Sequence, residues 1–189
     1  MLFVLSLSHF IKVTILGLIF FGLSSCAVVD PSRSSNEFYQ LQAIPLILQH
    51  EVFLESLTFK VPDNRQLLTQ IEINEVTLSL AAMTYSGLTI MQAQWHEEKG
   101  LLNFSSQIFG KDMLLRIIRD IQLVKWPENA IKTGLLTGYQ LISRNQGVTI
   151  SREIIKADQV VVSIIYTQKK VVLTNFVENY ELVIENVNE

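Results

Sequence analysis

Short segments in which apolar and polar residues alternate constrain the fold of this chain more than any other feature of its sequence. Side chains along a β-strand point to opposite faces in turn, so a period of two indicates a strand with one buried face. Residues 55–61 alternate in this way until Pro62, and residues 70–80 alternate for eleven positions. The spacing of three between Ile73 and Val76 predicts a turn or a bulge within that second segment. Further strand-like segments are 88–95, 101–104, 139–144, 148–155, 160–166, 170–176 and 180–187.

One block in the middle of the chain has helical periodicity instead. Apolar residues recur at spacings of three and four over 112–124, which predicts a helix that Asp112 is placed to cap. Three of its polar residues are expected on an outward, solvated face: Arg116, Arg119 and Asp120. A second helix is predicted over about 127–136, because proline suits the first helical turn, and Gly138 is a suitable C-terminal cap.

The order of these segments predicts one domain over residues 37–189 that is mainly β with α, an α+β fold. It has about ten strands, with two helices inserted after the first five. Strands joined by short turns form an antiparallel meander, and helices that come in one block must pack on one face of it. A long twisted sheet tends to curl. We therefore expect a curved antiparallel half-barrel, lidded by two or more helices that enclose an apolar space.

The first 25 residues have the composition of an export signal. Sixteen of them are apolar and Lys12 is their one basic residue, whereas 76 of the remaining 164 residues, or 46%, are apolar, as is ordinary for a globular protein. Residues 13–22 match the hydrophobic region of a signal peptide in length. The tetrad Leu23-Ser24-Ser25-Cys26 resembles the lipobox of bacterial lipoproteins, whose cysteine thiol takes a diacylglyceryl group.

This resemblance implies a signal peptide over 1–25, followed over 26–36 by the lipidated Cys26 and a flexible tether that attach the protein to a lipid membrane. Cys26 is the one cysteine of the chain, so no disulfide can form within it. The alternative is an uncleaved transmembrane anchor over 2–23, although polar residues interrupt that segment. In lipoproteins of enteric bacteria, aspartate after the lipidated cysteine favours retention in the inner membrane. Ala27 stands there, which implies the periplasmic face of the outer membrane.

Charge and residue content exclude several classes of function. After residue 25 the chain has 14 basic and 18 acidic residues, a net charge of −4, which argues against nucleic acid or an anionic lipid surface as a partner. His50 and His96 have no second histidine or cysteine close by, so a zinc site is not expected. Glu97 and Glu98 beside His96 fit a charged hairpin tip better than an acid/base group. The Gly-x-Ser-x-Gly motif of hydrolases is absent from the sequence. We expect no catalytic site, no metal and no cofactor.

Four short motifs in residues 37–189 carry a resemblance to a known family. They are Asp112-Met113-Leu114-Leu115, Leu123-Val124-Lys125-Trp126-Pro127 with Ala130-Ile131 after it, Leu173-Thr174-Asn175 and Tyr180-Glu181-Leu182. With them the chain resembles a family of small bacterial lipoproteins whose genes often sit in clusters for aryl-polyene pigments. That family is similar in architecture to the soluble lipoprotein chaperone LolA and its outer-membrane receptor LolB. In both, a half-barrel lidded by helices surrounds a cavity for acyl chains, and a lipidated Cys26 is closer to the receptor.

The resemblance implies a non-enzymatic, monomeric outer-membrane lipoprotein that binds an acyl-bearing molecule and assists its delivery. The ligand class would be a lipoprotein, a glycolipid or an aryl-polyene lipid. The residues expected to line the cavity, with Trp126 at its entrance, are Met113, Leu114, Ile117, Ile118, Ile121, Trp126 and Ile164. The same residues fit an ordinary core equally well, because a lid is apolar on its inner face in either case. The alternative is therefore a structural lipoprotein with a solid core that docks a partner protein.

Overall fold

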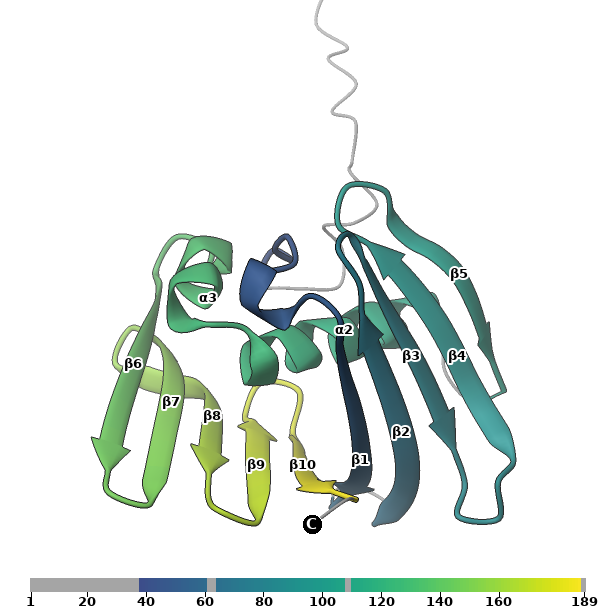
Figure 1. The fold of residues 1–189 in the computed structure, drawn as a ribbon. Helices are drawn as coiled ribbons and strands as arrows, with labels where there is room; N and C mark the ends of the chain where they lie inside the picture. Colours follow the sequence, from purple (N-terminus) through teal and green to yellow (C-terminus); the bar gives the residue numbers. More distant parts are fainter. Residues whose placement is uncertain (1–37, 61–63, 108–109, 188–189) are drawn as a thin grey trace, which may run out of the picture. The chain divides into compact units, whose positions relative to one another are not determined.

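The computed structural model describes residues 38–60, 64–107 and 110–187, which form one ten-stranded antiparallel sheet with two α-helices (Figure 1). The prediction of a mainly β fold, with two helices after the first five of about ten strands, is confirmed. The sheet is open, with β5 at one edge and β6 at the other, which fits the expected half-barrel. The predicted signal peptide, the lipobox with Cys26 and the tether lie outside the described residues.

The helices and strands occur along the chain in the predicted order. The 3-10 helix η2 (Leu46–Leu48) comes first, and the first half of the sheet follows: β1 (Glu51–Phe59), β2 (Arg65–Ile73), β3 (Thr77–Met83), β4 (Thr89–His96) and β5 (Gly100–Ser106). The helices are α2 (Lys111–Lys125) and α3 (Glu128–Gly134). The second half of the sheet is β6 (Tyr139–Gln146), β7 (Thr149–Lys156), β8 (Gln159–Tyr166), β9 (Lys170–Asn175) and β10 (Tyr180–Asn186).

The first and last strands of the chain are neighbours in the middle of the sheet. The strand order is β5-β4-β3-β2-β1-β10-β9-β8-β7-β6, and β1 pairs with β10 from Glu55 opposite Asn186 to Phe59 opposite Leu182. Two five-stranded meanders are thereby joined at this pair. The link from β5 to β6 must pass from one edge of the sheet to the other. The 15 residues of α2, about 22 Å long, make most of that crossing on one face of the strands (Figure 1).

The helix ends differ from the prediction in two places. Gly110, not Asp112, is the N-cap of α2, and Asp112 lies in the first turn, where its charge suits the helix dipole. Leu135, not Gly138, is the C-cap of α3, because the chain leaves the helix there to form a β-bridge with Tyr39. Gly138 has a φ of 89° and serves the turn into β6, a conformation that glycine adopts without strain.

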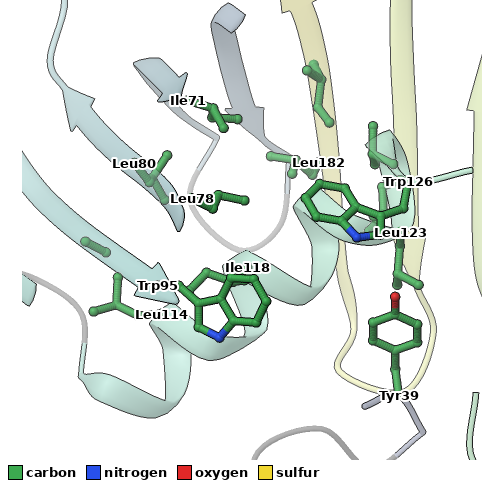
Figure 2. Close-up of a cluster of buried hydrophobic side chains, with 14 of the residues drawn as sticks. Tyr39, Ile71, Leu78, Leu80, Trp95, Leu114, Ile118, Leu123, Trp126 and Leu182 are labelled. Atoms are coloured by element: carbon green, nitrogen blue, oxygen red, sulfur yellow. The ribbon is translucent and has the colours of Figure 1, made fainter. Parts of the chain in front are cut away.

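The core lies between α2 and the inner face of the sheet (Figure 2). Alternate residues of β2 form part of it, since Leu67 and Ile71 are 6% and 2% exposed while Gln70 points to the opposite face. From α2, Leu114 and Ile118 are both 0% exposed, and Trp95 of β4 lies beside them in Figure 2. The residues that the period of two predicts as buried in the strands therefore contact those that the period of 3.6 predicts as buried in the helix.

Residues 38–44 pack against a different side of α2. The Tyr39 hydroxyl donates a hydrogen bond to Gln122 Oε1 at 3.2 Å, and the Gln42 backbone N–H donates to the same oxygen at 2.8 Å. In return Gln122 Nε2 donates to the Gln42 carbonyl at 3.0 Å. Gln122 is 0% exposed, so these bonds supply the partners that a buried amide requires. Because of this segment, α2 is covered on two sides rather than one.

Candidate functional site

An apolar pocket lies between α2 and the strands β1–β4 and β10. Its residues come from all six elements: Leu57, Phe59, Leu67, Ile71, Leu80, Ala82, Met91, Ile117, Ile121, Val124, Leu182 and Ile184, with Glu55, Thr69, Asp120 and Lys125 as polar members. The cavity that remains has a volume of about 40 Å³. That is room for only a few water molecules, so the pocket is nearly filled by its own side chains.

The two periodicities of the sequence build the two walls of this pocket. The helix wall is one stripe of α2 at spacings of four and three: Ile117, Ile121 and Val124. On the strand wall, Leu57 of β1 is opposite Leu67 of β2 on one side and Ile184 of β10 on the other. These three residues form a row across the joint between the two meanders. The pocket therefore exists because α2 crosses the sheet at the place where its first and last strands meet.

The structure divides the residues predicted to line an acyl cavity into three groups. Two of them, Ile117 and Ile121, line the pocket. Four are at most 1% exposed and belong to the core, not to the pocket lining: Leu114, Ile118, Trp126 and Ile164. Met113 is 42% exposed, so its prediction as a cavity residue is wrong. It shares the stripe of Ile117, but the pocket begins one helical turn later.

The prediction that Trp126 lies at the pocket entrance is also wrong. Trp126 is 0% exposed, and its indole Nε1 donates to the Ala43 carbonyl at 3.0 Å. A buried indole N–H needs such a partner. The Trp126 carbonyl accepts a hydrogen bond from Arg152 Nη1 at 3.0 Å. Trp126 therefore fixes the end of α2 between residues 38–44 and strand β7.

An ion pair closes one end of the pocket. Lys125 Nζ donates to Glu55 Oε1, and the two side chains are 14% and 10% exposed. The ammonium also lies 4.0 Å from the centre of the Phe53 ring, a favourable cation–π distance. Because both charges are largely removed from water, each depends on the other, and the loss of one would leave its partner uncompensated. The pair joins the last turn of α2 to β1.

A buried cluster of charges holds the middle of α2, where the sequence predicts a solvated face. Arg119 and Asp120 are 0% and 8% exposed, so that prediction is wrong for both residues. Arg119 donates from Nη1 to Glu178 Oε1 at 3.1 Å, from Nη2 to Glu178 Oε2 at 2.8 Å and from Nε to Asp120 Oδ1 at 3.0 Å. Tyr180 donates its hydroxyl to Asp120 Oδ2. Glu178 lies in the turn between β9 and β10, and Tyr180 begins β10. Half-exposed Arg116 places its Nε 3.4 Å from Glu178 Oε1.

These contacts set the charge states in the cluster. Burial raises the pKa of the Asp120 carboxyl, and the Arg119 charge and the Tyr180 hydrogen bond offset only part of this rise. Burial also acts to raise the pKa of Glu178, but the hydrogen bond and charge of Arg119 outweigh it, so the pKa of Glu178 lies below its ordinary value. Burial raises the pKa of the Tyr180 hydroxyl. At neutral pH Glu178 is therefore a carboxylate, and Tyr180 keeps the proton that it donates.

The predicted hairpin tip at residues 96–100 is confirmed as the turn between β4 and β5. The Glu98 backbone N–H donates to His96 Nδ1 at 3.1 Å, and Glu97 Oε2 accepts a hydrogen bond from the Ile44 backbone N–H at 2.9 Å. Both side chains thus have structural partners. Among residues 38–60, 64–107 and 110–187, no group of three or more His, Cys, Asp or Glu side chains could hold a metal ion. In the same residues, no helix is both long and apolar enough to cross a membrane.

Comparison with known proteins found one family model, and it matches most of the chain. A family model described as "Protein of unknown function (DUF3261)" matches residues 50–188. The match covers all ten strands and both α-helices, and so every residue that lines the pocket. No curated protein matches the chain. The family description names no activity.

Proposed function

The chain belongs to DUF3261, a family of proteins of unknown function, and we propose that it is a non-enzymatic outer-membrane lipoprotein that binds an acyl-bearing molecule and assists its delivery. Lipidated Cys26 would attach it to the membrane at the periplasmic face, as the lipobox resemblance implies. Its ligand would be a lipoprotein, a glycolipid or an aryl-polyene lipid. The acyl chain would enter between α2 and β1–β4, as in the LolA and LolB carriers.

The apolar pocket is the observation that carries this proposal. Twelve of its sixteen lining residues are apolar, and they come from a helix wall and a strand wall that face each other. Each methylene of an acyl chain buried against such walls contributes about 0.8 kcal/mol. A volume of about 40 Å³ is too small for a chain of many methylenes, so binding requires the two walls to separate.

The attachments of α2 favour a particular way of opening. Its C-terminal end is tied by polar contacts to the second half of the sheet: Tyr166 donates its hydroxyl to the Val124 carbonyl at 2.8 Å, and Arg152 holds the Trp126 carbonyl. Toward the first half, α2 presents the apolar helix wall and the ion pair between Lys125 and Glu55. Movement of β1–β4 away from α2 would expose the apolar residues of both pocket walls. A bound acyl chain would bury these residues again.

Native mass spectrometry of the full chain with palmitate tests the proposal. The protein is purified in a bile-salt detergent, which has no alkyl chain to compete, and the fraction that retains palmitate is measured. In the Ile121→Gln variant an amide would face the acyl chain, at a cost of about 1–3 kcal/mol, so retention should fall roughly 5- to 150-fold. The matched control is Ile165→Gln on β8, where the residue is 40% exposed and does not line the pocket. Ile117→Gln repeats the test if Ile121→Gln does not fold.

The buried packing around the pocket favours a second candidate, a structural lipoprotein with a solid core that docks a partner protein. Four residues predicted to line a cavity are at most 1% exposed and fill the core instead: Leu114, Ile118, Trp126 and Ile164. If palmitate does not bind to the wild type, or binds equally to the Ile121 and Ile165 variants, the carrier proposal fails and this candidate replaces it.

The anchor has a separate test. A Cys26→Ser variant lacks the thiol that would be lipidated, so it should move from the membrane fraction to the soluble periplasmic fraction. A variant that stays in the membrane would instead support the uncleaved anchor over residues 2–23. This experiment measures where the protein is located and not what it binds, so its result does not depend on the palmitate measurement.

A further inference from the structure

The face of β2–β5 that points away from α2 carries a second hollow. Gln70 and Glu72 line it, and they alternate along β2 with Ile71 and Ile73, which are 2% and 1% exposed in the core. The hollow therefore lies on the opposite face of the sheet from the acyl pocket. Its volume is about 450 Å³, within the range of small-molecule sites. Residues of all four strands line it.

The register of the strands arranges its polar side chains in two rows. In the first row, Gln70 of β2 is followed across the sheet by Ala81, Gln92 and Ser105. The second row is Glu72, Ser79, Gln94 and Asn103. Strands lie about 4.8 Å apart and alternate residues about 7 Å apart, so each row is about 14 Å long and the rows run side by side. An elongated ligand that crosses the strands would meet both rows.

The chemistry of the rows selects the kind of ligand. The lining residues include four side-chain amides and two serine hydroxyls, each able to donate and to accept hydrogen bonds, but one carboxylate and no lysine or arginine. Phosphate and sulfate groups would lack a cation to bind. An added peptide strand would lack backbone partners, because the N–H and C=O groups of β3 and β4 already pair with both neighbours. Vicinal hydroxyl groups, by contrast, match amides that donate and accept at once.

We propose that this hollow binds a neutral oligosaccharide lying across β2–β5. The amides of Gln92, Gln94 and Asn103 bind ring hydroxyls, and the methyl group of Ala81, with the methylenes of the glutamines, contacts the C–H faces of the rings. Hydrogen bonds from Gln70 to Glu72 at 2.5 Å and from Asn103 to Gln94 at 3.5 Å link side chains that line the hollow. The site is independent of the acyl pocket.

Saturation-transfer NMR of the full chain with uncharged oligosaccharides tests this site. The probes are cellohexaose, chitohexaose and maltohexaose, with an anionic hyaluronate hexasaccharide and a neutral polar peptide as comparisons. At least one uncharged hexasaccharide should bind, and Gln92→Ala and Gln94→Ala should each weaken it about 2- to 10-fold, as expected for one lost hydrogen bond. The matched control is Gln140→Ala on β6, an exposed glutamine outside the hollow, which should leave the affinity unchanged.

Gln92 is exposed, so its variant is expected to fold, and circular dichroism checks this. The proposal is overturned if none of the three uncharged probes binds, or if Gln140→Ala weakens binding as much as the two hollow variants. It is also overturned if the peptide or hyaluronate binds in the hollow in preference to the neutral sugars.

Discussion

Arg119 on α2 donates hydrogen bonds from both guanidinium Nη atoms to the two carboxylate oxygens of Glu178, in the turn between β9 and β10, at 3.1 Å and 2.8 Å. Paired planar groups of this kind form the stronger class of ion pair. Arg119 is 0% exposed, and its third contact, through Nε, is to Asp120. The pair fixes the middle of the helix to the second half of the sheet. It thereby ties the helix wall of the apolar pocket to the second half of the sheet.

Replacing Arg119 by leucine should destabilise the fold by about 3–5 kcal/mol, because buried Asp120 and partly buried Glu178 would remain without their cation. Equilibrium unfolding in urea measures the loss. The control is Arg144→Leu, since Arg144 pairs with Glu153 at the surface and its side chain is 49% exposed. That variant should lose no more than about 1 kcal/mol. Equal losses in the two variants would contradict a structural role for the buried cluster.

The same cluster should make stability depend on pH. The pKa of Glu178 is lower in the folded protein than its ordinary value of 4.5, so its ion pair contributes stability above about pH 4.5. That contribution is lost as the pH falls through the lowered pKa. Asp120, whose pKa burial raises, acts in the opposite direction. Glu178→Gln should therefore be less stable than the wild type at neutral pH, and the difference should shrink below pH 4.5. Urea unfolding of both proteins across this range checks it, and a constant difference would refute it.

Replacing Gly134 by alanine should be costly because the helix end touches residues 38–44. An added Cβ would lie 2.4 Å from Tyr39 Cε2 and 2.7 Å from the Gln40 carbonyl oxygen. Since one of these atoms belongs to the backbone, the clash should cost about 1–3 kcal/mol or more. At Gly110 the same change meets no atom within 4 Å, so Gly110→Ala serves as the control, with a loss of no more than about 1 kcal/mol because Gly110 is the N-cap of α2. Thermal melting compares the two variants, and the prediction fails if Gly134→Ala has the same Tm as the wild type.

The ion pair at the end of the pocket should show strong coupling. Lys125→Met alone leaves the Glu55 carboxylate largely buried without its partner, and we expect a loss of about 3–5 kcal/mol. Adding Glu55→Leu removes the uncompensated charge and should restore most of that stability. A double-mutant cycle in urea isolates the interaction between the two residues. Additive losses, with no recovery in the double variant, would show that the pair does not hold α2 to β1.

The strands and their order along the chain were predictable because most of them bury one face. The period of two over residues 70–80 reflects the buried Ile71 and Ile73, and the irregular spacing before Val76 marks the turn between β2 and β3. Five strands, a helical block and five more strands can be recognised from local patterns alone. The helix stripe of Ile117 and Ile121 was predictable for the same reason.

The burial of Arg119 and Asp120 could not be predicted from the helix pattern. A periodicity identifies one apolar side and assumes that the other faces water, whereas α2 is covered by residues 38–44 and by the turn at Glu178. These partners lie about 60 to 80 residues away in sequence. Neither their spacing nor their type marks them as partners of the helix. The ion pair between Lys125 and Glu55 escaped prediction for the same reason.

The position of β10 beside β1 has a consequence for how the chain reaches this fold. The β1–β5 meander contains only neighbouring pairs and can form from local contacts, but the edge of β1 stays open until the last strand is available. Pairings between the two ends of a chain form slowly, because a long loop must close first. During that interval the unpaired backbone groups at the edge of β1 can pair with a strand of another molecule. A chain that ends before Tyr180 should therefore tend to aggregate, even though most of its strands are intact.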